Sequence, residues 1–291
     1  MLPEAGPRES GAIPPPRRSR SRLGIGGQGT KAILIAAAST VVFFTVLTIL
    51  VVNAPGWAQV QRAFFDGRVF VESIPRIVRG FWTNVQLFLV AEVLVLVWGL
   101  ALAVMRSVPG PAFFPIRLLA TAYVDLFRAL PGLLVIFMLG FGFTGLRIEG
   151  VPTDRFFWAV VALTLLYSAY VSEVYRAGIE SIHPSQEAAA RSLGLSRFQS
   201  LRYVVVPQAV RRVIPPLLND FIGLQKDTVL VSFIGVVEVF RATQIEQQAR
   251  FNFTPLLVTA LIFVAVTLPL ARFVDYLIAR EQRRRAAGRL R

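Results

Sequence analysis

Residues 185–227 read SQEAAARSLGLSRFQSLRYVVVPQAVRRVIPPLLNDFIGLQKD, and apolar stretches of membrane-spanning length flank this segment. Ser185 can cap a first helix, and Glu187 in its first turn suits the positive end of the helix dipole. Gly194 stands where the end of that helix favours a left-handed residue. Between them lie three strong helix formers whose small side chains let another protein approach closely: Ala188, Ala189 and Ala190.

A second short helix is predicted after Gly194. Ser196 and Gln199, three residues apart, form the pattern of a capping box at its start. Pro207 is expected to end this helix, because proline donates no backbone hydrogen bond. Three residues at positions i, i+3 and i+7 give the helix one apolar face: Phe198, Leu201 and Val205. A helix–glycine–helix hairpin between membrane spans is typical of a docking element.

The composition indicates a membrane protein. Of 291 residues, 55% are hydrophobic, and the apolar residues gather in several long blocks. The formal charge is +14, but Lys and Arg concentrate at span ends and in the tails, so membrane topology explains them better than nucleic-acid binding. The chain has no cysteine and one histidine, which excludes disulfides, thiol nucleophiles and Cys/His metal sites.

Hydropathy predicts an all-α polytopic membrane protein with about six transmembrane helices, of which the first is an N-terminal signal-anchor span. The expected spans cover residues 32–52, 85–105, 130–146, 156–174, 213–239 and 256–276. Four regions follow from this division: a disordered basic tail (1–31), the first span with an outer loop (32–80), a transmembrane domain (81–279) and a second basic tail (280–291).

The positive-inside rule gives the orientation. With six spans and the N-terminus inside, 22 of the 31 Lys and Arg residues lie on inner segments and eight on outer loops. Both tails and the 183–207 hairpin are therefore expected in the cytoplasm.

Ionisable residues within spans usually face a bundle interior or water, because charge in hydrocarbon is costly. The fifth stretch contains a polar stripe at helical spacing, made of Asn219, Asp220, Gly223, Lys226 and Asp227. The stripe has two interpretations: an ion-pair network that joins helices, or the lining of a substrate path.

Three other polar residues stand out. Glu92 lies in the middle of the second span, where it either lines a path or binds a neighbouring helix. Glu173 and Arg176 are three residues apart at the end of the fourth span and are expected to form a structural pair. His183 has no partner for a metal site and is expected to be a solvated loop residue.

The hairpin also resembles the cytoplasmic EAA loop of ABC-transporter inner-membrane permeases, whose pattern is EAA, three residues, Gly, nine residues, Ile, any residue, Leu, Pro. Gly194 and Pro207 keep this spacing, with Val204 and Val206 in place of Ile and Leu. Glu187 lies one position ahead of the glutamate that is usual in the family.

Four further segments are similar to the polar-amino-acid uptake branch of these permeases, so that the resemblance extends over about residues 80–279. In the third of them, Val229 replaces the serine that usually follows Lys-Asp-Thr. The segments are YVDLFRALP (123–131), SAYVSEVYRAGIESI (168–182), LLNDFIGLQKDTVLVSFIGVVE (217–238) and TLPLARF (267–273).

The resemblance implies a permease core of five spans after the signal anchor. It implies an importer of polar or charged amino acids in the bacterial inner membrane, in which this chain is a transport subunit and no enzyme. The chain would bind no cofactor itself, because ATP and Mg belong to a separate ATPase. Other implied partners are a second permease subunit, identical or homologous, an extracytoplasmic substrate-binding protein, and the lipid bilayer.

The resemblance also assigns roles to individual residues. The ATPase-docking residues would be Ser185, Gln186, Glu187, Ala188, Ala189, Ala190, Gly194, Leu195, Phe198 and Pro207. The substrate path would include Asn219, Asp220, Gly223, Lys226, Asp227, Thr228, Glu92, Ser168 and Tyr170.

An ion-coupled secondary amino-acid carrier is the alternative, with Asp220, Lys226 and Asp227 as ion or proton relays. Such a carrier has no use for the hairpin, which separates the two hypotheses. A membrane anchor without transport activity is a third alternative, and it predicts no polar stripe inside the spans.

Overall fold

The computed structural model describes residues 30–288, and this part of the chain consists of helices joined by short loops, with no β-strand. The expected all-α fold class is confirmed. The chain divides into two compact units, Met1–Gln59 and Val60–Arg291. The described part of the first unit contains helix α1 (Thr30–Val52), which confirms a helix over the expected first span. Helix α2 (Trp57–Phe64) follows it in the sequence.

Helix α3 (Gly67–Ser107) is longer than the predicted second span. It begins where the side chain of Asp66 accepts hydrogen bonds from the backbone of Arg68 and Val69. Its first turns were expected to belong to an outer loop, which the sequence analysis extended to residue 80. Packing overrides that expectation, since Ile77 lies in a buried cluster with side chains of two later helices.

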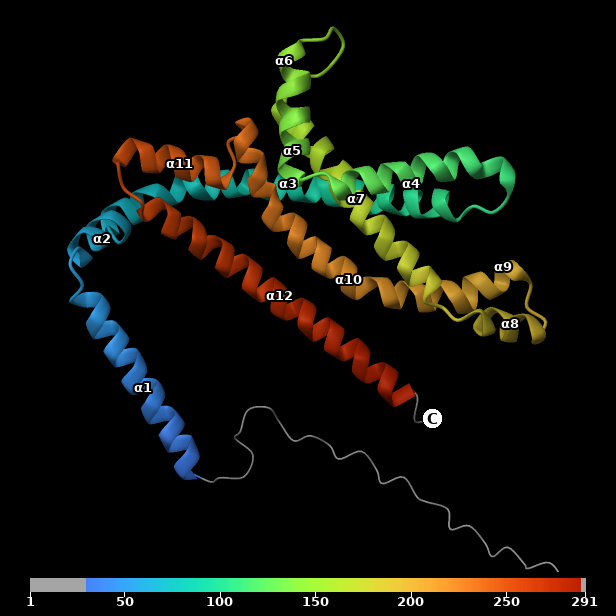
Figure 1. The fold of residues 1–291 in the computed structure, drawn as a ribbon, viewed down its shortest axis with the longest axis horizontal. Helices are drawn as coiled ribbons and strands as arrows, with labels where there is room; N and C mark the ends of the chain where they lie inside the picture. The colour runs from blue at the N-terminus through green and yellow to red at the C-terminus, as the bar shows by residue number, and fades with distance from the viewer. Residues whose placement is uncertain (1–29, 289–291) are drawn as a thin grey trace, which may run out of the picture. The chain divides into compact units, whose positions relative to one another are not determined.

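The predicted third span is bent. A 3₁₀ turn (Pro111–Phe113) leads into α4 (Phe114–Ala129), which sequence analysis had left in an inner loop. The chain then turns by 105° at Leu130 and Pro131. Figure 1 shows α4 and α5 running in different directions. Leu130 is extended there, because a residue before proline avoids helical backbone angles. The continuation consists of α5 (Gly132–Phe137), a π-helical turn (Met138–Phe143) and α6 (Thr144–Leu146).

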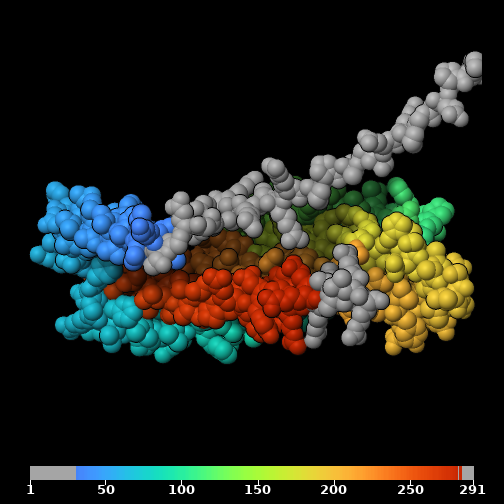
Figure 2. Space-filling model, turned by 90° about the horizontal axis from the view of Figure 1, so that it is seen from below, coloured from blue at the N-terminus to red at the C-terminus, as the bar shows by residue number. Residues whose placement is uncertain are grey.

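The rest of the chain, from α7 to α12, completes the second unit. Helix α7 packs along α3, and α10 packs against α7. Figure 2 shows α12 along one face of this unit. The elements are α7 (Arg155–Glu180), α8 (Pro184–Ser192), α9 (Arg197–Ser200), a π-helical turn (Leu201–Val205), α10 (Val206–Asp227), a 3₁₀ helix (Thr228–Ile234), α11 (Val239–Arg250) and α12 (Thr254–Gly288).

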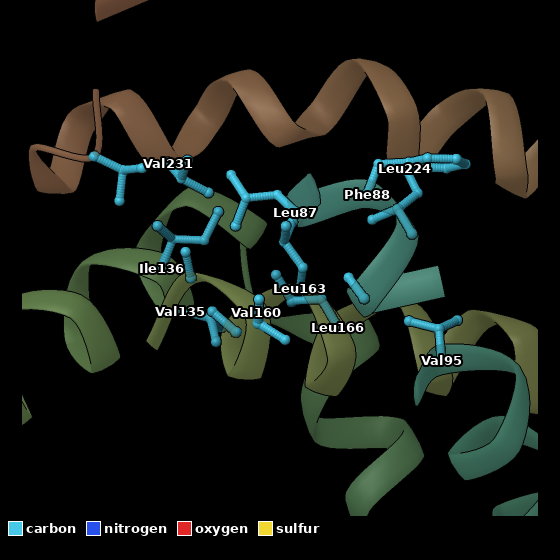
Figure 3. Packing of buried hydrophobic residues seen from close by; sticks show 14 of the residues in the cluster. Leu87, Phe88, Val95, Val135, Ile136, Val160, Leu163, Leu166, Leu224 and Val231 are labelled. Atoms are coloured by element: carbon cyan, nitrogen blue, oxygen red, sulfur yellow. The ribbon is translucent and has the colours of Figure 1, made fainter. Parts of the chain in front are cut away.

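The buried core joins segments that are far apart in the sequence. Figure 3 shows Leu87 and Phe88 of α3 among side chains of α5, α7, α10 and the 3₁₀ helix. The helices approach closely where glycine leaves room: a Cβ at Gly99 would lie 2.7 Å from a methyl group of Val171. Large apolar side chains outside the core are exposed along α3 and α12, which suits a chain surrounded by lipid.

Within residues 30–288, four helices are long and apolar enough to cross a membrane, and the number rises to six if each of two bent helix pairs counts as one span. The expected six spans agree with the higher number. The pair of Glu173 and Arg176 is confirmed at 2.5 Å, and Glu173 also binds Arg106 of α3 at 2.5 Å. This carboxylate therefore links two helices.

Two glycines of the π-helical turn Met138–Phe143 give a matched test of the packing. A Cβ at Gly140 would lie within 2.9 Å of three side-chain atoms of Ile234, whereas a Cβ at Gly142 would meet nothing within 4 Å. We expect Gly140→Ala to destabilise the detergent-solubilised protein by about 1–3 kcal/mol through overpacking. Gly142→Ala should leave the thermal unfolding midpoint unchanged. Equal midpoints for the two variants would contradict this packing.

Candidate functional site

A cavity of about 300 Å³ lies between α7, α10 and the bend that precedes α5. Its wall combines apolar side chains with two carboxylates, two phenols and an amide. The lining residues are Leu130, Gly132, Ile136, Leu163, Leu166, Tyr167, Tyr170, Asn219, Asp220, Gly223, Asp227 and Leu230. A mostly apolar pocket with a few converging polar groups is the usual form of a small-molecule site.

The polar stripe of α10 forms one side of this cavity. Asn219, Asp220, Gly223 and Asp227 all line it, as the helical spacing predicts. Asp227 accepts a hydrogen bond of 2.7 Å from the hydroxyl of Tyr167 on α7. A Cβ at Gly223 would lie 3.4 Å from the same hydroxyl oxygen. Gly223 therefore lies in van der Waals range of the tyrosine that holds Asp227.

The carboxylates of the cavity have no basic partner within the described residues. The oxygen Oδ2 of Asp220 is buried and has no hydrogen-bond partner in this part of the chain. Glu92 of α3 does not line the cavity, but it lies within electrostatic range of Asp220. Neighbouring negative charges without counter-ions repel each other and attract a cation. The geometry therefore offers no support for an ion-pair network in the stripe.

Lys226 lies at the edge of the stripe and does not line the cavity. Its side chain is exposed and forms no ion pair among residues 30–288. The expected place of Lys226 on a substrate path therefore stays a prediction, because a long side chain at the edge of a stripe can point away from the cavity.

Two other residues expected on the path lie elsewhere. Thr228 is buried, where its hydroxyl donates to the Gln225 carbonyl and accepts from the Asn84 amide at 3.0 Å. The same amide donates to the carboxylate of Glu238, which caps α11. Ser168 faces α4 instead, with its hydroxyl 2.9 Å from that of Tyr123. Both residues serve packing between helices.

Sequence reasoning missed Tyr167, although a helical signal for it exists. Leu163, Leu166, Tyr167 and Tyr170 follow the i, i+3, i+4, i+7 spacing of one helix face, and this face lines the cavity. Ser168 is next to Tyr167 in sequence but about 100° away around the helix. Starting from Tyr170, this spacing selects Tyr167 and rejects Ser168.

The hairpin at 183–207 begins differently from the prediction. His183, not Ser185, caps α8, since its ring nitrogen Nδ1 accepts a hydrogen bond of 3.2 Å from the backbone of Ser185. Pro184 is the first helical residue, a position that suits proline, and it moves the cap back to His183. The His183 side chain is exposed, as expected.

The glycine turn and the second cap agree with the prediction. Gly194 has a φ of +88°, and its N–H donates to the Arg191 carbonyl while that of Leu195 donates to Ala190. These two hydrogen bonds form the pattern in which a helix ends at a left-handed glycine. The capping box of Ser196 and Gln199 is present.

Pro207 does not end the second helix, which corrects the expectation. The backbone passes from α9 through the π-helical turn Leu201–Val205 directly into α10. Proline fits here because it occupies the first turn of α10, where it displaces no α-helical hydrogen bond. One continuous helix therefore joins the hairpin to the cavity.

The hairpin presents an uncovered apolar surface. Leu193 is 83% exposed and Phe198 72%. Ala188, Ala189 and Gly194 are also exposed, so the small residues leave the backbone accessible. Among the expected docking residues, Ala190 is buried and cannot contact another protein directly.

The remaining expected docking residues lie at or near this surface. Ser185, Gln186 and Pro207 are exposed, and Glu187 and Leu195 are half-buried. Phe198 does not share one buried face with Leu201 and Val205, since only Val205 is buried. Val205 packs with Ile182 and Ala209, and this contact anchors the hairpin to the neighbouring segments.

Comparison with known proteins identifies the family. Residues 96–283 match the sequence model of the family described as binding-protein-dependent transport system inner membrane component. The probable glutamine ABC transporter permease protein GlnM of Bacillus subtilis is 35% identical over 201 residues, which are 68% of this chain and 89% of that protein.

A second relative and a solved structure agree with this match. The glutamate/aspartate import permease protein GltK of Escherichia coli is 32% identical over 219 residues, covering 73% of this chain and 96% of its own length. A crystal structure described as an amino acid ABC transporter with histidines has a TM-score of 0.67 and 31% identity, covering 74% of this chain and 98% of that one. The chain therefore belongs to the family of binding-protein-dependent transport system inner membrane components.

Proposed function

We propose that this chain is the permease subunit of an ATP-driven importer that carries a polar or charged amino acid across the bacterial inner membrane. The observation that carries the proposal is the continuous helix Arg197–Asp227, which bears part of the exposed hairpin at one end and Asp220 and Asp227 at the other. The names of the relatives, which transport glutamine or glutamate and aspartate, support the substrate class.

The continuous helix suggests how a motor subunit acts on the path. A helix of this length spans roughly 45 Å at about 1.5 Å per residue. A push on α9 moves α10 as a rod, because the helical backbone continues from α9 through the π-helical turn into α10. The carboxylates of Asp220 and Asp227 then move relative to α7, which opens or closes the cavity to one side. Coupling of this kind is mechanical and needs no catalytic group on this chain.

The cavity favours a substrate with a positively charged group. Asp220 and Asp227 lack counter-ions in the described chain, so a substrate ammonium can supply one. The hydroxyl of Tyr167 keeps Asp227 oriented towards α7. A volume of about 300 Å³ is at the small end of the range for ligand sites, which suits a single amino acid.

The implied partners follow from this role. A separate ATPase holds ATP and Mg and docks on Leu193, Phe198 and the exposed alanines of the hairpin. A second permease subunit completes the path, and an extracytoplasmic binding protein delivers the amino acid. The secondary-carrier alternative leaves the exposed hairpin without a purpose, and ATP dependence of uptake separates the two.

Uptake assays test the function and the hairpin together. The complex is purified through a tag on this chain, reconstituted in liposomes with its binding protein, and supplied with labelled glutamine, glutamate or arginine. We expect uptake of at least one of these amino acids only when ATP is present on the side of the membrane that the ATPase faces. Uptake driven by an ion gradient without ATP would contradict the proposal.

Gly194→Asp should reduce that uptake about tenfold. An L-residue at positive φ costs on the order of 1 kcal/mol, and the new carboxylate stands at the negative end of a helix dipole. Gly150→Asp is the matched control, because Gly150 is also exposed and has a φ of +81°. Normal uptake and normal ATPase binding in Gly194→Asp would show that the hairpin is not the coupling element.

Asp220→Asn tests the path. Because Asp220 has no basic partner in the described residues, removing its charge should leave the yield of the complex unchanged. Uptake should fall about tenfold or more, the value of one charged hydrogen bond. Asp125→Asn, at an exposed aspartate of α4, is the control.

Tyr167→Phe provides an independent measurement at the same site. It removes the hydrogen bond to Asp227 and keeps the ring, so uptake should fall by a smaller factor of roughly threefold. Loss of the assembled complex in Asp220→Asn would instead indicate a structural role for the carboxylate. Full uptake in both variants would remove the cavity from the path.

We propose further that both termini and the hairpin face the cytoplasm, supported by the excess of basic residues on those segments. The chain has no cysteine, so a single introduced cysteine is a clean probe. Both Glu149 and Ala112 are exposed. In intact cells an impermeant thiol reagent should label Glu149→Cys, and should label Ala112→Cys only after permeabilisation. The reverse pattern would invert the orientation.

A further inference from the structure

A second cavity, of about 310 Å³, lies beyond the far end of the 3₁₀ helix Thr228–Ile234. Three elements besides that helix contribute to it: the π-helical turn before α6, the first residue of α7, and α11. The lining residues are Phe141, Arg155, Ser232, Phe233, Ile234, Gly235, Arg241 and Gln244. The cavity contains two arginines and no acidic residue.

The two arginines have no carboxylate partner in the part of the chain that the structure describes. Arg155 forms no ion pair there, and Arg241 donates only to the side-chain oxygen of Gln244 at 3.1 Å. The cavity therefore brings together two guanidinium groups whose charge no carboxylate of the described chain neutralises.

The acidic residues near these arginines in sequence already accept hydrogen bonds from backbone N–H groups at helix starts. Asp154 uses both oxygens to cap α7 at the backbone of Phe156 and Phe157. Glu238 accepts hydrogen bonds from the backbone of Phe240 and Arg241. Neither carboxylate neutralises the cavity, because each already satisfies the start of a helix.

Ser232 adds an independent observation. Its side chain is 5% exposed, it lines the cavity, and its hydroxyl has no hydrogen-bond partner among the described residues. A buried hydroxyl without a partner is unfavourable, so such a group commonly marks a place where a ligand binds. A hydroxyl donor in a cavity that two guanidinium groups also line is suited to an anion.

Gly235 positions one of the arginines. Its φ is +85°, and a Cβ at this position would lie 2.5 Å from a guanidinium nitrogen of Arg155. The guanidinium therefore lies directly over the backbone of the turn, where only glycine leaves room. Arg155 therefore contacts the turn that ends the 3₁₀ helix, while its side chain remains exposed.

We infer that this cavity binds the carboxylate of the amino-acid substrate before the substrate reaches Asp220 and Asp227. The inference rests on the proposed function. A carboxylate matches the planar guanidinium fork in geometry as well as charge. The unpaired carboxylates of the first cavity suit the ammonium group in the same way.

The 3₁₀ helix connects the two sites. Asp227 and Leu230 line the first cavity, and Ser232 and Gly235 line the second. Five residues separate Asp227 from Ser232, which is about 10 Å at 2 Å per residue. A single amino acid is too short to fill both sites at once, so it passes from an arginine site to an aspartate site.

Binding to the purified complex, without binding protein, tests this site. All proteins carry Asp220→Asn, so that the first cavity contributes little. Labelled L-glutamate, L-glutamine and L-arginine are each competed with the unlabelled amino acid or with its α-amide. The α-amide lacks the charge of the α-carboxylate. We expect the acid to bind about tenfold more tightly than the amide.

Arg155→Gln should lose that preference, and Ser232→Ala should reduce the affinity for the acid by about threefold. Arg79→Gln is the matched control, because Arg79 is an exposed arginine of α3 that makes no ion pair in residues 30–288. An unchanged preference in Arg155→Gln would overturn the inference.

Two further outcomes distinguish a failure of this inference from a failure of the proposed function. If Arg155→Gln binds the amino acid normally but loses affinity for the binding protein, the arginines hold a carboxylate of that protein and the inference is wrong. If the complex with unchanged Asp220 imports none of the three amino acids, the proposed function fails. Import together with an unchanged acid preference in Arg155→Gln overturns only the carboxylate site.

Discussion

The unbroken helical course of the backbone from Arg197 to Asp227 is the constraint on which the second unit depends. In hydrocarbon an unsatisfied backbone group costs several kcal/mol, so a spanning segment has to remain helical. Three prolines interrupt the donors of this segment, at 207, 215 and 216. The π-helical turn before Pro207 widens the helix where the first proline enters, and the rod stays intact. Hairpin and cavity thereby become two ends of one element.

Charge is distributed in two ways within this unit. At helix ends it is paired: Glu173 binds Arg106 and Arg176, and Glu246 binds Arg250 at 2.9 Å. In the two cavities it is left without partners among the described residues. An unpaired charge within a span costs about 2.5–3.5 kcal/mol on the insertion scale. Stability alone does not explain unpaired carboxylates of that cost at Asp220 and Asp227, and the ammonium group of the proposed substrate would supply the missing counter-ion.

The hairpin was largely predictable, because its determinants are local. The left-handed turn at Gly194 and the capping box of Ser196 and Gln199 depend on residues within a few positions of each other. The errors also have local causes. Ser185 looked like the cap because serine is a preferred capping residue. The first helical residue is Pro184, however, so the cap is His183. Pro207 looked like a helix end because a π-helical turn leaves no clear signal in sequence.

The sequence by itself determined the all-α fold class, the approximate spans, the hairpin and the polar stripe of α10, since hydropathy and helical period depend on the order of residues alone. Only the tertiary structure decided which polar residues meet. Tyr167 and Ser168 are neighbours in the chain, yet one binds Asp227 and the other faces Tyr123. Arg155 and Ser232 lie 77 positions apart and line one cavity. Which side of a helix meets which neighbour follows from packing between distant segments, and no local pattern encodes it.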